Sequence, residues 1–175
     1  MQKLIVDTNI LQYAAREEYA NGAARLFQTL LDRKLEAYIS GYTAFEVYRG
    51  IASKKIPVTR AIVDQFTAAL PDILTYKVAA ILTTCYNTHE ATKSYASRIS
   101  DGDVVIAASA IRDQAGVLTA NGNDFPRPFF TEVESFQLEN SKTGAIIIAH
   151  LLEPDLSVYF HNRDICYPKA AVPGR

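Results

Sequence analysis

Short apolar runs alternate with stretches of helical periodicity along the first two thirds of the chain. The apolar runs are typical of buried strands, and we expect strands at residues 3–6, 37–40, 73–76 and 117–119. Between them, apolar residues recur every three or four positions, as on one face of a helix. Helices are predicted at 10–33 with a break at Asn21-Gly22, 43–50 capped by Thr43, 57–70, 78–98 and 104–111. This alternation over short connections predicts an α/β fold with a parallel sheet covered by helices.

The last third of the chain has a different pattern. Apolar runs at 145–148 and 156–160 flank Glu153-Pro154-Asp155, which predicts a hairpin or two extra strands. We therefore expect a main domain at residues 1–138 and a C-terminal extension at 139–175 that packs on it and ends in a loosely held tail. A chain of 175 residues, 49% of them hydrophobic, is long enough for one substantial core.

Charge and cysteine content narrow the class of protein. Lys and Arg total 18 against 19 for Asp and Glu, so no large basic field is available for nonspecific binding to polyanions. The first apolar run is too short for a secretory signal or a membrane span, which predicts a cytoplasmic protein that does not contact a membrane. Cys85 and Cys166 stand apart, so we expect neither a zinc ribbon nor a redox pair.

Four acidic residues stand at or just past the ends of separate predicted elements: Asp7, Glu46, Asp103 and Asp124. In an α/β sheet, loops and helix starts at the carboxyl edge of the strands face one crevice, so these four side chains are expected to converge. Converging carboxylates repel one another, and a divalent cation removes the repulsion. Oxygen ligands without Cys or His favour Mg²⁺ or Mn²⁺, and phosphodiester hydrolysis is a common use of such a site.

Each acid also has an ordinary structural interpretation. Asp7 and Asp103 are favoured helix caps, and Asp124 suits a turn. Glu46 is three residues from Arg49, the spacing of an ion pair on a helix surface. The occurrence of all four at the ends of successive elements favours the metal site.

Further polar residues near the four acids are weaker candidates for the site. Asp101 is the rival of Asp103 for the third ligand position. Thr8, Asn9, Thr119 and Asn121 are expected to orient the carboxylates or bound water. No residue is predicted to bind an organic cofactor.

At these residues the chain resembles PIN-domain ribonucleases, and more narrowly the VapC-type toxins of toxin–antitoxin pairs. The similarity spans about residues 3–136. Four segments carry it: Leu4-Ile5-Val6-Asp7-Thr8-Asn9, Ser40 to Gly50 with Glu46, Asp103 to Ala110, and Val117 to Phe125 with Asp124. Two features depart from the family: Ala120 stands where relatives often have Arg, and the segment after residue 140 exceeds what a compact toxin carries.

The resemblance implies a three-layer α/β/α sandwich and a Mg²⁺- or Mn²⁺-dependent endoribonuclease with Asp7, Glu46, Asp103 and Asp124 as metal ligands and water as the nucleophile. It also implies an RNA substrate, a homodimer and an antitoxin partner. Two alternatives stay open: a PIN-fold module that binds RNA or protein without catalysis, and a phosphatase that forms an aspartyl phosphate. The second is weakened because Asn9 stands where such phosphatases have a second Asp.

Surface residues are also expected to contact the RNA and the antitoxin. The expected RNA contacts are Arg16, Arg49, Lys54, Lys55, Lys93, Arg98 and a stacking Tyr95. An antitoxin helix is expected to dock on Leu11, Tyr13, Leu26 and Phe27.

Overall fold

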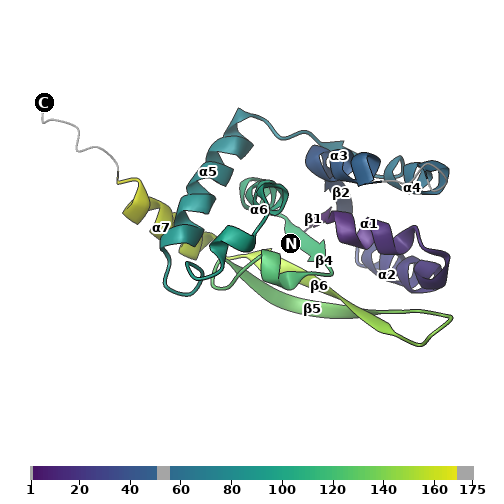
Figure 1. Cartoon of the computed structure of the whole chain (residues 1–175). Helices are drawn as coiled ribbons and strands as arrows, with labels where there is room; N and C mark the ends of the chain where they lie inside the picture. Colours follow the sequence, from purple (N-terminus) through teal and green to yellow (C-terminus); the bar gives the residue numbers. More distant parts are fainter. Residues whose placement is uncertain (1, 51–55, 169–175) are drawn as a thin grey trace, which may run out of the picture.

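A six-stranded sheet forms the centre of the computed structural model, which describes residues 2–50 and 56–168 (Figure 1). The strand order is β3-β2-β1-β4-β6-β5. Strands β1, β2, β3 and β4 pair in parallel, whereas β6 is antiparallel to both β4 and β5. The strands are β1 (Lys3–Val6), β2 (Glu36–Ser40), β3 (Thr67–Ala69), β4 (Gly116–Thr119), β5 (Phe130–Glu139) and β6 (Ile146–Pro154).

Seven α-helices and three 3-10 turns connect or follow these strands in the described ranges. The helices are α1 (Thr8–Ala14), α2 (Ala20–Asp32), α3 (Gly41–Gly50), α4 (Ile56–Val63), α5 (Ile73–Thr88), α6 (Asp101–Asp113) and α7 (Leu156–Cys166). The turns are η1 (Glu17–Tyr19), η2 (Ala96–Arg98) and η3 (Gly122–Asp124). The predicted α/β fold with a mostly parallel, helix-covered sheet is therefore confirmed.

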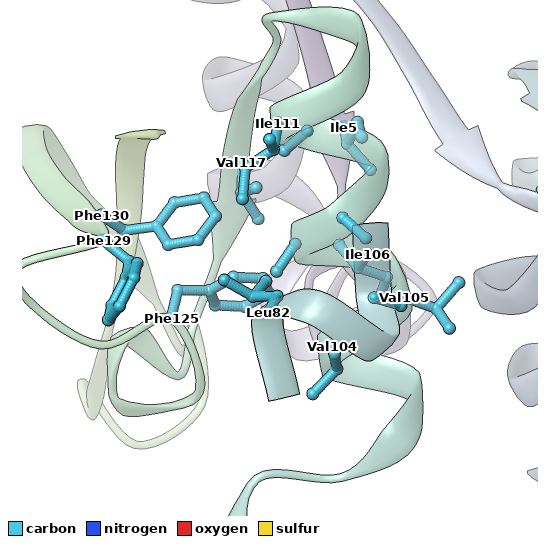
Figure 2. Packing of buried hydrophobic residues seen from close by; sticks show 14 of the residues in the cluster. Ile5, Leu82, Val104, Val105, Ile106, Ile111, Val117, Phe125, Phe129 and Phe130 are labelled. Carbon is cyan, nitrogen blue, oxygen red and sulfur yellow. The ribbon is translucent and has the colours of Figure 1, made fainter. Parts of the chain in front are cut away.

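Alternate residues of β1 enter two cores on opposite faces of the sheet. Ile5 belongs to a cluster with residues of α5, α6 and α7, and Figure 2 shows part of it, including Ile111 of α6 and Val117 of β4. Leu4 and Val6 belong to a second cluster with residues of α1, α2, α3 and α4. This division follows from the two-residue period of a strand and makes the fold three-layered.

Gly102 lets the start of α6 approach α3 closely. A Cβ atom at this position would lie 2.2 Å from Cε1 of Tyr42, which is far inside contact distance. Only a residue without a side chain fits there while the Tyr42 ring keeps its place. The close approach brings the first turn of α6, with Asp103, toward the helix that carries Glu46.

Several predicted elements were wrong because local capping decided the structure. Residues 73–76 begin α5, since Asp72 and Thr75 form a capping box at its N-terminus. Residues 156–160 begin α7, since the side chain of Asp155 accepts a hydrogen bond from the Val158 N–H group.

Other predicted boundaries also differ from the structure. The expected helix at 57–70 ends at Val63, and the edge strand β3 follows at 67–69. The expected helix at 78–98 ends at Thr88. Thr43 lies inside α3 and does not cap it, and the break in the 10–33 stretch falls at η1, before Asn21.

The last third of the chain contributes to the same sheet as the first. Strand β6 lies between β4 and β5, and Tyr159 of α7 belongs to the cluster that also contains α5 and α6. The boundary at residue 138 stays a prediction, and residues 169–175 of the expected tail lie outside the described ranges. None of the helices in residues 2–50 and 56–168 is long and apolar enough to cross a membrane.

An apolar groove of about 420 Å³ lies along α2 and α4. Phe27, Leu31 and Phe66 line it, and Leu31 is 66% exposed. Two residues expected to contact an antitoxin are not available there, because Leu11 and Leu26 are buried in the core at 0% and 3% exposure. That part of the expected docking surface was wrong.

Candidate metal centre

Asp7 follows β1 and is held by donors from two neighbouring elements. Its side chain is 2% exposed. Oδ1 accepts a hydrogen bond from the Thr8 N–H at 2.6 Å, and Oδ2 accepts from Asn9 Nδ2 at 2.6 Å and from Thr119 Oγ1 at 2.7 Å. Asp7 is also the N-cap residue of α1, so the ordinary capping interpretation holds as well. The same side chain can serve both purposes because only part of its hydrogen-bonding capacity is used at the helix start.

The pKa of Asp7 is raised to about 7 from an ordinary value near 3.8. Burial is the largest cause, and the neighbouring charges of Asp103 and Glu46 raise it further, whereas the hydrogen bonds from Thr119 and Thr8 lower it. A buried carboxylate beside other acids resists ionisation. An added cation would therefore strongly favour the ionised form of Asp7.

Glu46 lies on α3, half-buried, beside the start of α1. Its Oε2 atom accepts a hydrogen bond from Thr8 Oγ1 at 2.7 Å. No ion pair joins it to Arg49, whose guanidinium lies over the Phe45 ring at 5.4 Å, so that interpretation of Glu46 was wrong. Thr8 thus bridges the first two acids, bonding one through its backbone and the other through its hydroxyl.

Asp103 lies in the first turn of α6, where Ser100 is the N-cap residue. Ser100 Oγ donates to Asp103 Oδ2 at 2.6 Å and accepts from the Asp103 N–H at 3.2 Å. The cap interpretation of Asp103 was therefore wrong, and its charge raises the pKa of both Asp7 and Asp124. Asp101 is exposed and lines a different hollow, together with Tyr42 and Tyr76.

Asp124 ends the η3 turn that follows β4. Its Oδ2 atom accepts a hydrogen bond from Asn121 Nδ2 at 2.6 Å. Its pKa is raised to about 6, first by burial and then by the charge of Asp103, while the bond from Asn121 lowers it. Asp103 is therefore the acid whose charge acts on Asp7 and Asp124 alike.

The four acids offer only oxygen atoms as ligands, but each carboxylate accepts from its own hydrogen-bond donors. In residues 2–50 and 56–168, no three His, Cys, Asp or Glu side chains are grouped so that they could hold one ion as they lie. The donors are Thr8, Asn9, Ser100, Thr119 and Asn121. The carboxylate oxygens fit a hard cation such as Mg²⁺ or Mn²⁺, and burial followed by the charge of Asp103 raises the pKa values of Asp7 and Asp124.

An open cleft of about 840 Å³ adjoins Asp124. Tyr95 and Arg98, both expected to contact RNA, line it, as does Ala120, and Arg127 adds a second guanidinium that sequence reasoning missed. No pattern around Arg127 would have identified it. Ser100 was missed as well, although a Ser three residues before an Asp at a helix start is a recognisable capping signature.

The other residues expected to contact RNA are differently placed. Arg16 lies over the Tyr13 ring at 5.1 Å, and Lys93 pairs with Glu90 at 2.7 Å. Lys54 and Lys55 lie outside the described residues.

Comparison with known proteins identifies a family for this chain. The family model of the PIN domain matches residues 4–129. No curated protein matched the chain. Among solved structures, the crystal structure of FitAcB from Neisseria gonorrhoeae is similar, with a TM-score of 0.54 and 21% sequence identity. The similarity covers 70% of this chain and 90% of that one, and at this identity it supports the fold.

Proposed function

The chain belongs to the PIN-domain family, and from this premise we propose that it is an endoribonuclease that depends on Mg²⁺ or Mn²⁺. PIN domains are generally nucleases. The proposed metal ligands are Asp7, Glu46, Asp103 and Asp124. RNA as the substrate and the identity of the cation are parts of the proposal.

The observation that carries the proposal is the electrostatic coupling of acids from separate elements. Burial raises the pKa of Asp7 and of Asp124 most, Asp103 raises both further, and Glu46 adds to the effect on Asp7. Four acids with a purely structural role would be dispersed or paired with bases, because clustering them costs free energy. In residues 2–50 and 56–168 none of the four forms an ion pair with Lys, Arg or His.

The hydrogen-bond donors around the acids would position them for a shared cation. Thr8 holds Glu46, Ser100 holds Asp103 and Asn121 holds Asp124, each at 2.6–2.7 Å. A bound cation would polarise the scissile phosphate and offset the repulsion among the carboxylates. On binding the cation, the three carboxylates would rotate from these donors toward it. The donors keep the carboxylates near the site until then.

A phosphatase that forms an aspartyl phosphate is disfavoured by the environment of Asp7. Asn9, whose Nδ2 donates to Asp7 Oδ2 at 2.6 Å, stands where such phosphatases have a second Asp, so the second carboxylate of their motif is missing. A noncatalytic binding module stays the main alternative. Such a module would bind its ligand without a cation and would not cleave RNA, so a cleavage assay with and without cation distinguishes it from the nuclease.

The direct test is cleavage of a labelled single-stranded RNA by the purified chain with Mg²⁺, with Mn²⁺ and with EDTA. We expect cleavage only with a cation, and loss of cleavage in Asp7→Asn, Glu46→Gln, Asp103→Asn and Asp124→Asn. Asp32→Asn is the matched control, since Asp32 is exposed on α2 and bonds only to Gln28. RNA binding without cleavage under every condition would favour the noncatalytic module.

We further propose that the protein is the toxin of a toxin–antitoxin pair and acts in the cytoplasm as a homodimer. The apolar groove along α2 and α4 would accept an amphipathic antitoxin helix on Phe27 and Leu31. Exposed apolar side chains before and at the start of α5, among them Leu70, Ile73 and Leu74, support a dimer contact. Each part has its own test. Slowed growth on expression tests the toxin, relief by coexpression of the neighbouring small gene tests the antitoxin, and light scattering of the purified chain tests the dimer.

A further inference from the structure

The open cleft beside Asp124 has a composition that the cluster of acids does not explain. Tyr95, Arg98 and Ile99, at and beside η2, form part of its lining, and the β4–β5 connection forms another part. His150 of β6 and Glu132 of β5 also line it. The cleft therefore joins the parallel half of the sheet to the antiparallel hairpin.

Two arginine side chains face this cleft without an ion pair among the described residues to hold them. Arg98 and Arg127 both line it and are both exposed, and neither forms an ion pair with a carboxylate of the described residues. Two acids also line the cleft, and each has a hydrogen-bond partner that is not an arginine: Asp124 accepts from Asn121 Nδ2 at 2.6 Å, and Glu132 Oε2 lies 3.0 Å from His150 Nδ1. Since the chain as a whole carries a net charge of −1, these local cations are the feature that can attract a polyanion.

The floor of the cleft is rigid, and its wall carries an aromatic ring. Phe125 and Phe130 line the cleft but are buried at 2% and 1% exposure, and their rings pack edge to face with centroids 5.5 Å apart (Figure 2). Tyr95 lines the cleft and is half-buried, so part of its side chain packs against the protein and part is accessible to a ligand. An aromatic face next to guanidinium groups is the arrangement that binds single-stranded nucleic acid.

We propose that this cleft binds the single-stranded RNA segment adjoining the scissile phosphate, with a backbone phosphate on Arg98 and Arg127 and a base stacked on Tyr95. This inference rests on the proposed ribonuclease function. Asp124 lines the cleft, so a strand lying in it passes beside one of the four acids. Positive charge beside the acidic centre offsets the repulsion that an approaching phosphate meets there.

Binding of a fluorescein-labelled 12-nucleotide RNA, measured by anisotropy in EDTA, tests the cleft without cleavage. We expect Arg98→Ala and Arg127→Ala each to raise the dissociation constant about three- to tenfold. Each should also reduce the slope of log affinity against log salt by about 0.7, the loss of one phosphate contact on a single strand. Arg25→Ala, an exposed arginine on α2 away from the cleft, is the matched control and should change neither quantity.

The stacking role of Tyr95 has its own pair of variants. Tyr95→Phe keeps the ring and should bind RNA as the wild type does, whereas Tyr95→Leu should weaken binding about fivefold or more. In the cleavage assay KM should follow the dissociation constant, so it should rise in Tyr95→Leu and stay near the wild-type value in Tyr95→Phe. Equal binding by the Phe and Leu variants would remove Tyr95 from the proposal.

The possible results separate this inference from the ribonuclease function. If the wild type cleaves RNA and the arginine variants match Arg25→Ala in affinity and salt slope, the cleft does not hold RNA and the nuclease stands. If the wild type binds RNA through these arginines but never cleaves it, the RNA-binding role of the cleft is supported and the proposed nuclease activity is contradicted. A wild type that neither binds nor cleaves RNA overturns both.

Discussion

The hydroxyl of Thr119 donates a 2.7 Å hydrogen bond to Asp7 across the pairing of β4 with β1. Its oxygen also accepts from Asn9 Nδ2 at 3.1 Å and from the Asn121 N–H at 3.0 Å. One side chain thus connects the first acid to the loop that carries the last. The position of Asp7 and the course of that loop depend on the same hydroxyl.

Replacement of this hydroxyl by a methyl group in Thr119→Val should therefore affect stability and activity together. Two donors lose their acceptor, so the free energy of unfolding should fall by about 1–3 kcal/mol. The bond lowers the pKa of Asp7, so its loss should move the pH profile of RNA cleavage upward. Thr119→Ser keeps the hydroxyl and serves as the control. Urea denaturation and a pH series of cleavage rates measure both effects, and an unchanged profile in the Val variant would contradict the orienting role.

Asp7→Asn should increase the stability of the metal-free protein above neutral pH. The folded-state pKa, about 7, lies above the ordinary value of 3.8, so the native state binds the proton more tightly than the unfolded chain. Stability from this group is therefore present at low pH and is lost as the pH rises from about 4 to 7. In EDTA at pH 8 the Asn variant should be more stable than the wild type by on the order of 2–4 kcal/mol.

At pH 4 this advantage of Asp7→Asn should almost disappear, because the folded-state carboxyl is then protonated and pH 4 is close to the unfolded-state pKa of 3.8. Denaturant curves at the two pH values provide the comparison. If Asp7→Asn and the wild type are equally stable at pH 8, ionisation of Asp7 does not destabilise the folded protein, and the prediction is wrong.

Asp103→Ala should lose far more RNA cleavage than Asp101→Ala. Asp103 acts on the charges of Asp7 and Asp124, whereas Asp101 lines a separate hollow with Tyr42. Removal of a metal ligand costs several kcal/mol of transition-state stabilisation, or at least about a hundredfold in rate. We expect a change within about threefold for Asp101→Ala. The reverse order in a cleavage assay would assign the third ligand position to Asp101.

Mn²⁺ should stabilise the wild-type protein more at pH 8 than at pH 5. Two of the proposed ligands, Asp7 and Asp124, have pKa values raised to about 7 and about 6, so protons compete with the cation at the lower pH. At a hundred times the dissociation constant, binding adds about 2.7 kcal/mol to the free energy of unfolding. Thermal melting with and without Mn²⁺ measures this. An equal effect in Asp7→Asn would falsify the assignment of Asp7 as a ligand.

Leu31→Glu should prevent copurification with the antitoxin and leave RNA cleavage unchanged. Leu31 lines the apolar groove and is 66% exposed, so a charge there meets the apolar face of a docked helix without disturbing the core. Ile165→Glu, at an exposed position on α7, is the control. Coexpression with the neighbouring small gene and a pull-down provide the measurement, and intact pairing of the Leu31 variant would place the contact elsewhere.

The sequence was informative where a local pattern decided the structure. The runs at 3–6 and 117–119 match β1 and β4, and the Ala-rich stretch at 104–111 lies within α6, because strands and helices buried on most sides are apolar almost throughout. These elements also carry or adjoin Asp7 and Asp103. Their placement near one another was therefore predictable in outline.

The rest depended on contacts distant in sequence. Strand β5 was missed because most of its residues are exposed or half-buried, and only Phe130 and Leu138 at its ends are buried, so no apolar alternation marks it. The pairing of β6 between β4 and β5 and the place of Arg127 in a cleft follow from tertiary packing alone. The sequence predicted some of the hydrogen-bond donors of the acids. It did not predict which donor bonds to which carboxylate.

The position of β6 inside the sheet has a consequence for how the protein is made. Strand β1 can pair with β4 only after more than a hundred further residues have been synthesised. Strand β4 can pair with its second neighbour, β6, only when residues 146–154 have left the ribosome. Such long-range pairing is slow to form and cannot precede synthesis of its last partner. A nascent chain therefore carries the four acids dispersed at least until β4 and η3 have been synthesised, so the proposed nuclease centre cannot assemble early in translation.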